Sequence, residues 1–292
     1  MKITDPGQAV IDRATQGDLA ALDATLLAIQ PGVFNLAVRM LGNREDAADA
    51  TQEILLKVVT HLAGFRGQAA FSTWVFQIAR NHLLTASTRS RESPEVSLEA
   101  LGERLQQGLE FTASLGDPLG GARTLTPEDK LAARQVALSC TQNMLMALDR
   151  EQRLVYVLDV VFGLASPEAA EVLAITPEAY RQRLARARAK LDGFAGSTCG
   201  QVTRAAACQC ERQVPALAHV RATSSSPAPS LVAIHRRERA EAERQFDALV
   251  RMGDTAAVFR AHPTYEAPDA IVQAIRVVLR AEGYLGDDRA AH

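Results

Sequence analysis

The sequence predicts an all-α protein: two small helical domains joined by a flexible linker, followed by a helical C-terminal extension. Three observations support this fold class. Apolar residues recur at three- and four-residue spacing along most of the chain, helix-start signatures precede several of these stretches, and Gly- and Pro-rich segments interrupt them. We place the first domain at residues 1–91, the linker at 92–131, the second domain at 132–194 and the extension at 195–292.

Composition limits the classes of function. The 292 residues carry a net charge of −2, so any binding to nucleic acid must rest on local charge. The longest apolar run, residues 154–165, is short and contains Asp159, and the N-terminus lacks the apolar core of a signal peptide. We therefore expect a cytoplasmic protein without a membrane span, in which the four cysteines indicate metal or redox chemistry more than disulfides.

The first domain begins with two helices, over residues 9–29 and 33–41, which we expect Pro31 and Gly32 to separate. A further helix over residues 45–62 has an apolar stripe. Its opposite side is acidic, which is typical of a solvated helix face, but an exposed leucine within it favours a docking surface. The apolar stripe is Ala47, Ala50, Ile54, Val58 and Leu62, and the opposite side is Asp49, Gln52, Glu53 and Leu56.

The only tryptophan lies in the next segment. Residues 64–70 read as a loop that carries Arg66 and Gln68, and Ser72 offers an N-cap to a helix that extends to about Ser90. Aromatic faces stack on unpaired bases, and guanidinium and amide groups bond phosphates and base edges, so the segment suits single-stranded nucleic acid. Core packing is the competing interpretation, since apolar residues share one side of the helix. The apolar residues are Phe71, Trp74, Val75 and Ile78, and the polar residues at and beyond the helix exit are Arg80, Asn81, Arg89 and Arg91.

The second domain reads as four helices. After the linker, in which we expect one short helix near residues 98–109, helices are predicted over 128–148, 148–161, 167–174 and 177–191. The last two each begin with a Ser/Thr-Pro-Glu start signature, and the final helix is basic, which together is typical of a helix-turn-helix. A solvated basic helix is the alternative interpretation. The basic residues are Arg181, Arg183, Arg186, Arg188 and Lys190, over an apolar seam of Leu184, Ala187 and Leu191.

Taken together, these segments resemble a bacterial RNA polymerase sigma factor of the extracytoplasmic-function (ECF) type. The stretches LAVRMLGNREDAADATQEILLKV and FSTWVFQIARN resemble region 2 of that family, and EQRLVYVLDVVFGLASPEAAEVLAITPEAYRQRLARARAKL resembles region 4. Two departures stand out: Ala174 occupies the turn position where glycine is typical, and the final helix reads AYRQR, so the promoter preference does not carry over.

The resemblance implies specific roles. The acidic helix face of Asp49, Gln52, Glu53 and Leu56 would dock on core RNA polymerase. The −10 promoter element, where a base is flipped out of the stack, would contact Arg66, Gln68, Arg80 and Asn81, with Phe71 and Trp74 framing the pocket. The −35 element would meet Arg181, Gln182 and Arg183 at the bases and Arg186 and Arg188 on phosphates.

The extension contains features to which the family resemblance assigns no role. Cys199, Cys208 and Cys210 lie within a dozen residues, with His219 nearby, and could hold zinc or another metal or act as a thiol switch, although their spacing matches no standard zinc finger. No cofactor is required otherwise. A flexible linker is predicted at 223–230, with helices at 235–251, 256–260 and 269–281, the last with Ile271, Ile275, Val278 and Leu279 on one side.

Three function classes follow. The leading one is a sigma factor that binds core RNA polymerase and promoter DNA, melts the −10 element and has no catalytic residues of its own. It would be open to control by an anti-sigma factor or by its own extension. The second is a standalone helix-turn-helix regulator that acts without polymerase, and the third is a metal-responsive interaction protein. The acidic helix with Leu56 favours the first class, because a simple repressor does not need it.

Overall fold

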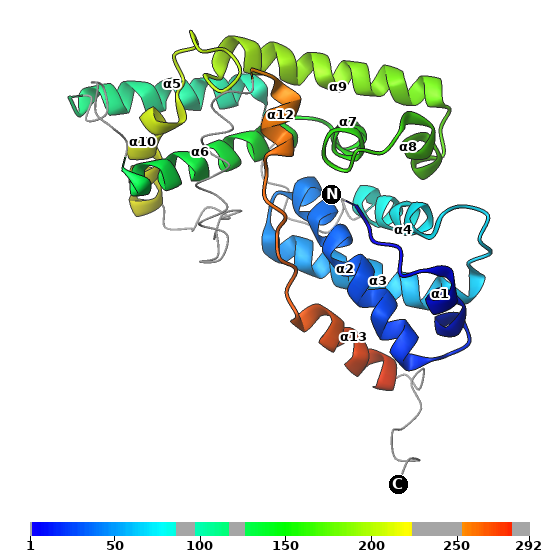
Figure 1. Cartoon of the computed structure of the whole chain (residues 1–292). Helices are drawn as coiled ribbons and strands as arrows, with labels where there is room; N and C mark the ends of the chain where they lie inside the picture. Colours follow the sequence, from blue (N-terminus) through cyan, green and yellow to red (C-terminus); the bar gives the residue numbers. More distant parts are fainter. Residues whose placement is uncertain (1, 86–96, 117–125, 224–252, 282–292) are drawn as a thin grey trace. The chain divides into compact units, whose positions relative to one another are not determined.

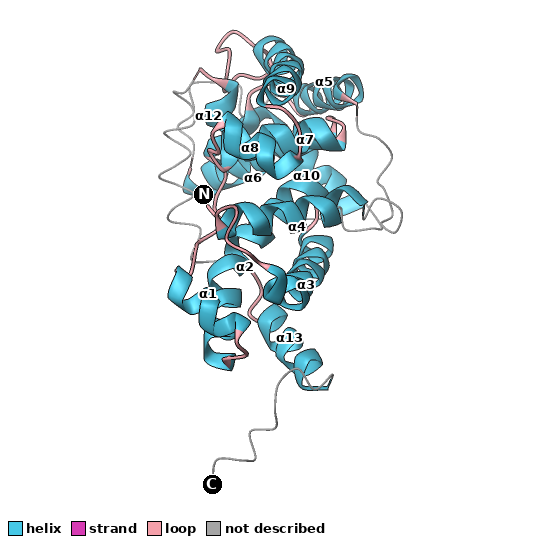
Figure 2. Cartoon of the chain, turned by 90° about the vertical axis from the view of Figure 1, so that its right-hand side faces the viewer, coloured by secondary structure: helices cyan, strands magenta, loops and turns pink. Residues whose placement is uncertain are grey.

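A computed structural model of the whole chain describes residues 2–85, 97–116, 126–223 and 253–281 (Figure 1). The described residues are helical with connecting loops and contain no strand, only one isolated bridge (Figure 2). This confirms the all-α prediction. The end of the helix predicted to run to Ser90, with Arg89 and Arg91, lies outside the described residues, as do the helix predicted over 235–251 and nearly all of the linker predicted over 223–230.

The chain forms two compact units. The first contains residues 1–90, 162–180 and 264–292, and the second contains residues 91–161 and 181–263. Helices α1 (Gln8–Thr15), α2 (Leu19–Leu41), α3 (Arg44–His61), α4 (Phe71–Thr85), α8 (Ser166–Leu173) and α13 (Ala270–Ala281) belong to the first unit, with the short turn η1 (Leu62–Gly64). The second unit holds α5 (Leu98–Ser114), α6 (Pro127–Met146), α7 (Arg150–Tyr156), η3 (Val157–Val161), η4 (Cys210–Gln213), α10 (Val214–Thr223), α12 (Thr255–Arg260) and all but the first turn of α9 (Pro177–Thr198).

The predicted break at Pro31 and Gly32 is wrong, because α2 runs through both residues. The break lies instead at Gly17, whose φ of 90° suits glycine, followed by Asp18, which caps α2 by accepting a bond from the Ala21 N–H at 3.0 Å. Proline removes one helical hydrogen bond, but nearly every residue from Ile29 to Met40 is buried. Burial of that length of apolar helix outweighs the local cost.

The core of the first unit is built from α2, α3 and α4, which pack on one another. All five residues of the apolar stripe predicted for residues 45–62 are buried, so this prediction is confirmed. By length and hydropathy α2 could also cross a membrane, but 67% of its most apolar window is buried inside the unit, as expected for a core helix.

Part of the extension completes the first unit. Helix α13 packs along α2 and α3 (Figure 1) and buries Ile271, Val272, Ile275 and Leu279. Val278, predicted on the buried side, is 38% exposed, because the contact centres on the side that carries Val272. The helices expected near 256–260 and 269–281 are both present, as α12 and α13.

The second unit differs from the sequence prediction mainly in its lengths. Helix α5 continues to Ser114 where a short helix ending near residue 109 was expected, and α9 continues to Thr198 past the predicted end at Leu191. Helix α6 begins with a capping box between Thr126 and Asp129. The turn η4 and helix α10 were not anticipated. They pack on α5 and α6, so the first part of the extension belongs to this unit.

Candidate nucleic-acid and partner interfaces

Helix α3 presents the acidic face expected from the sequence. The Asn43 side chain caps the helix by accepting from the Glu45 N–H at 2.8 Å. Asp49 and Glu53 are exposed, whereas Gln52 and Leu56 are half-buried. Leu56 is thus less exposed than the sequence argument assumed. We refer to Asp49, Gln52, Glu53 and Leu56 as the open face.

The open face borders a small polar group between α3 and α4. The Lys57 ammonium lies 3.0 Å from His82 Nδ1. Burial lowers the pKa of His82, the nearby Lys57 charge lowers it further, and Glu53 opposes both effects. A neutral His82 can accept a hydrogen bond from Lys57, so this contact favours the unprotonated ring.

One face of the neighbouring helix α2 is covered by the extension. Asn35, fully buried in α2, donates from Nδ2 to the Tyr265 carbonyl at 2.8 Å and accepts from the Tyr265 N–H at 2.8 Å. Arg39, one turn later and also buried, lies 5.3 Å from the centre of the Tyr265 ring, and burial lowers its pKa to about 10. Gln30 Nε2 donates to the Pro268 carbonyl at 2.8 Å, and Arg276 pairs with Asp23 at 2.7 Å. We call Asp23, Gln30, Asn35 and Arg39 the covered face.

The loop before α4 carries exposed polar side chains beside an aromatic cluster. Arg66 and Gln68 are exposed, and Gly67 has a φ of 67°, which favours glycine. Phe65 lies 5.3 Å from both Phe71 and Trp74, and those two rings are 5.6 Å apart. Phe71 is buried and Trp74 is half-buried, so Trp74 presents part of its ring to the outside beside the loop.

The start and core face of α4 correct two predictions. The helix begins at Phe71, and the Trp74 N–H bonds the Ala70 carbonyl, so Ser72 lies in the first turn and is not the N-cap. The fully buried residues include Val75, Phe76 and Ala79, whereas Ile78 is half-buried. The core side of α4 is therefore rotated away from Trp74 and Ile78.

The exit of α4 is held against α8, within the first unit. Arg80 donates from Nη1 to the Val172 carbonyl at 3.2 Å and from Nε to Asn81 Oδ1 at 2.9 Å. Gln77 Nε2 donates to the Glu171 carbonyl at 3.3 Å. The Phe76 and Phe162 rings meet edge to face at 5.3 Å. Of the two predicted DNA contacts here, Arg80 is half-buried in this arrangement and Asn81 is exposed.

The turn between α8 and α9 contains the alanine that departs from the family pattern. Ala174 has a φ of 52°, a left-handed conformation that costs a non-glycine residue about 1 kcal/mol. Its N–H bonds the Glu171 carbonyl at 3.1 Å. Thr176 then caps α9 by accepting from the Ala179 N–H at 3.2 Å, which confirms the predicted start signature.

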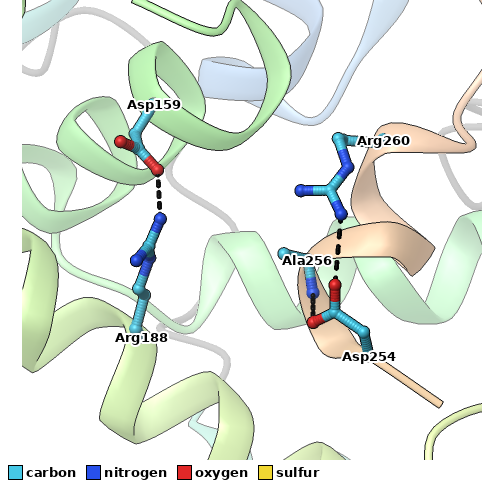
Figure 3. A network of polar contacts seen from close by, with 5 residues as sticks. All are labelled: Asp159, Arg188, Asp254, Ala256 and Arg260. Atoms are coloured by element: carbon cyan, nitrogen blue, oxygen red, sulfur yellow. Dashed lines mark hydrogen bonds and ion pairs between the residues drawn. The ribbon is translucent and has the colours of Figure 1, made fainter. Parts of the chain in front are cut away.

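Helix α9 separates its basic side from its apolar seam as predicted. Leu184, Ala187 and Leu191 are buried, whereas Arg181, Gln182 and Arg186 are exposed. The predicted site residues Arg183 and Arg188 are tied to carboxylates within the second unit. Arg183 pairs with Glu151 of α7 at 2.8 Å, and Arg188 pairs with Asp159 of η3 at 2.5 Å (Figure 3). These ion pairs orient α9 over α7 and η3.

The cysteines of the extension lie around one apolar cavity of the second unit. Cys199, Cys208 and Cys210 line it together with Cys140 of α6, a residue that the sequence analysis did not single out. Burial raises the pKa of each of the four thiols. His219 lies apart from the cavity, exposed and stacked on Phe111 at 4.7 Å. Among the described residues no three His, Cys, Asp or Glu side chains are grouped closely enough to hold a metal ion.

Two functional features escaped the sequence analysis. Cys140 lies 59 residues before Cys199, and only the packing of α6 against the segment that follows α9 brings the two to one cavity. Asn35 and Arg39 interrupt the apolar run VFNLAVRML with a four-residue spacing. That spacing places both on one helix face, a signal that could have indicated a buried polar contact.

Comparison with known proteins agrees with this geometry. The family model described as sigma-70 region 2 matches residues 26–92, and that described as sigma-70 region 4 matches residues 138–191. The chain is 26% identical to the RNA polymerase sigma-H factor of Pseudomonas aeruginosa over 196 residues, which are 66% of this chain and 95% of the relative. It is 25% identical over 195 residues to the ECF RNA polymerase sigma-E factors of Escherichia coli K12 and Salmonella typhimurium, covering 65% of this chain and 94% of each relative.

These matches leave a remainder at the C-terminal end. Residues 192–292 follow the second family match, and the chain is longer than the relatives that it covers almost completely. The covered face contacts residues from this remainder, and three of the four cysteines belong to it.

Proposed function

The chain is an RNA polymerase sigma factor of the ECF type with a C-terminal extension, and from this premise we propose how its surfaces divide the work. The open face of α3 binds core RNA polymerase. Asp49 and Glu53 are exposed carboxylates next to the partly accessible Leu56, a combination that suits a basic partner surface with an apolar contact. This exposed acidic face, on a region 2 fold, is the observation that carries the proposal.

The loop before α4 and the exit of α4 handle the opened −10 element. Arg66 and Gln68 are exposed beside the partly accessible ring of Trp74, so a flipped base could stack on the aromatic cluster while the polar groups bond its edge or phosphate. Phe71 supports the cluster from the core. Asn81 is exposed and can reach DNA directly.

Helix α9 reads the −35 element. Arg181, Gln182 and Arg186 are exposed and suited to base edges and phosphates. Arg183 and Arg188 first have to exchange their carboxylate partners for DNA. Ion pairs near the surface contribute about 0–1 kcal/mol, so opening these two pairs costs little free energy.

Promoter engagement also requires a change at α4. The Arg80 guanidinium is bonded to the Val172 carbonyl and the Asn81 side chain. We propose that α8 and α4 separate when the −10 element binds, since Arg80 cannot keep these bonds and contact DNA with the same donors. In the free protein, a few weak contacts hold α4 against α8 and the residues just before it.

The decisive experiment is run-off transcription with core polymerase, the full chain and a genomic promoter library. We expect discrete promoter-specific transcripts that core polymerase alone does not produce. A standalone regulator would instead bind duplex DNA in the absence of polymerase and yield no new transcripts. That outcome would overturn the proposed function, and the comparisons give it no support.

We also propose where the protein acts and how it is controlled. We expect the protein to act in the cytoplasm, where its polymerase and DNA partners are, and to have no enzymatic activity of its own. Control by an anti-sigma factor or by the extension is compatible with the fold. The extension contacts the α2 and α3 helices of region 2 directly, which favours self-regulation.

A further inference from the structure

All four cysteines of the chain line a single apolar cavity, although they come from separate segments. Cys140 is on α6, Cys199 directly follows α9, Cys208 lies two residues before η4, and Cys210 is the first residue of η4. The sigma-factor function assigns nothing to this cavity.

Two of these cysteines lie on paired backbone. Cys199 and Cys208 form an isolated parallel bridge, and the Gly200 N–H donates to the Cys208 carbonyl at 2.9 Å. Paired backbones run about 4.8 Å apart. A disulfide needs Cα atoms about 4.4–6.8 Å apart, so this pair can be joined with little backbone movement.

The loop that carries the pair is rigidly built. The Cys199 carbonyl accepts from the N–H groups of Val202 and Thr203 at 3.1 and 2.8 Å. Gln209 packs over Gly200, and its side-chain amide donates to the Ala206 carbonyl at 3.0 Å across the same loop. The bridge is therefore a fixed feature of the loop.

The side-chain amides of two buried glutamines donate hydrogen bonds to cysteine sulfur atoms. Gln213, 5% exposed, donates from Nε2 to Cys208 Sγ at 3.5 Å, and Gln201, also 5% exposed, donates to Cys210 Sγ at 3.7 Å. Gly108 of α5 leaves the room that Gln213 occupies, since a side chain there would lie 2.1 Å from Gln213 Oε1. The Gln213 donor favours the thiolate of Cys208, the form of cysteine that reacts, but burial is the larger effect and the pKa of this thiol stays raised.

We propose that Cys199 and Cys208 are a reversible thiol pair that a hydroperoxide converts into a disulfide. One thiolate attacks the peroxide oxygen, gives a sulfenic acid and releases an alcohol or water. The second thiol then attacks that sulfur, the S–S bond forms, and a second water leaves. Each thiol loses one hydrogen, two in total, and the hydroperoxide is reduced by two electrons to an alcohol or water plus one further water. Reduction by a dithiol reverses the change.

The bond would close the loop that links the end of α9 to η4. Cys199 directly follows α9, the helix that carries the −35 candidates, and Cys208 lies nine residues later; both follow the family match, which ends at residue 191. A metal site is the less suitable assignment, because no three of the possible ligands are grouped among the described residues, whereas a disulfide needs only two. Disulfides in cytoplasmic proteins are characteristically transient and redox-sensing.

The test is differential alkylation and intact mass of the full chain before and after hydrogen peroxide. We expect a loss of about 2 Da, one disulfide-linked peptide that contains Cys199 and Cys208, and a rise in Tm of about 5 °C that dithiothreitol reverses. Cys199→Ser and Cys208→Ser should each abolish this bond. Cys140→Ser and His219→Gln are matched controls that should retain it, since neither residue lies on the bridge.

Three outcomes would overturn the proposal. One is a disulfide that survives in both Cys199→Ser and Cys208→Ser, and another is thiols that stay free after complete exposure to peroxide. The third is a purified chain that contains about one zinc ion per molecule by elemental analysis and resists alkylation until the metal is chelated. None of these results depends on sigma activity, so they separate this inference from the proposed function.

Discussion

The covered face lies on α2 and the open face lies on the neighbouring helix α3, and the two faces serve opposite purposes. On the covered face, buried Asn35 and Arg39 contact Tyr265 of the extension, so the polar groups there have partners within the chain. On the open face, Asp49 and Glu53 are exposed. Changes at the first face should therefore cost stability, whereas changes at the second should cost binding.

The comparison also separates what the protein does from what holds it together. Removing a buried amide that makes two hydrogen bonds to the backbone lowers the free energy of unfolding strongly, because its partners are left unsatisfied. Removing an exposed carboxylate changes the stability little, and it weakens binding only where a partner contacts that carboxylate.

Asn35→Ala should have the largest effect on folding. It leaves the N–H and the carbonyl of Tyr265 without their partner in a buried site, which should lower the free energy of unfolding by about 3 kcal/mol. Urea denaturation followed by circular dichroism measures it. Gln52→Ala on the open face is the control and should change stability by less than about 0.5 kcal/mol.

Trp74→Ala tests the same division inside α4. Because Trp74 is half-buried, its loss should cost about 2 kcal/mol and leave the unit folded, whereas the buried Phe71→Ala should cost about 4 kcal/mol. The same denaturation series decides it, and equal costs for the two variants would contradict the division.

Arg276→Ala should have a small effect although it removes a contact of the extension. Its ion pair with Asp23 has short distances, 2.7 and 2.8 Å, but both side chains are about one-third exposed, at 29% and 35%. Water screens such a pair, so we expect a loss below about 1 kcal/mol that shrinks further in 1 M salt. A loss as large as that of Asn35→Ala would show that the covered face depends on charge.

His82 should give the smallest effect, visible only as a dependence on pH. Its folded pKa is lowered by burial and by Lys57, so the unfolded chain binds the proton more readily. Stability from this group is complete above the ordinary histidine pKa of 6.5 and is lost as the pH falls below it. In thermal melts between pH 7.5 and 5, the Tm of the parent chain should fall relative to that of His82→Gln as the pH decreases, because only the parent takes up a proton at this position on unfolding.

Much of the fold could be predicted because the relevant signals are local. The stripe from Ala47 to Leu62 and the start signature at Thr176 report directly on helix faces and ends. The break at Pro31 was predicted wrongly, because burial of the surrounding residues overrode proline's local preference. Likewise, the half-burial of Leu56 depends on neighbouring helices that no periodicity describes.

The site was only partly predictable for the same reason. The placement of Asp49, Glu53, Arg181 and Arg186 on exposed helix sides follows from helical period. In contrast, the ion pair that holds Arg188, the engagement of Arg80 by Val172 and the arrival of Cys140 beside Cys199 each join segments far apart in sequence. Such pairings depend on tertiary packing, which a single sequence does not reveal.

The most direct test of the two-face account is the affinity of the full chain for core RNA polymerase, measured by equilibrium fluorescence titration. Asp49→Arg combined with Glu53→Arg should weaken binding by about 100-fold while Tm stays within about 2 °C of the parent. Asn35→Ala should lower Tm and leave the affinity of the folded protein within about 3-fold. Unchanged affinity in the charge-reversed protein would contradict the assignment of the open face to polymerase.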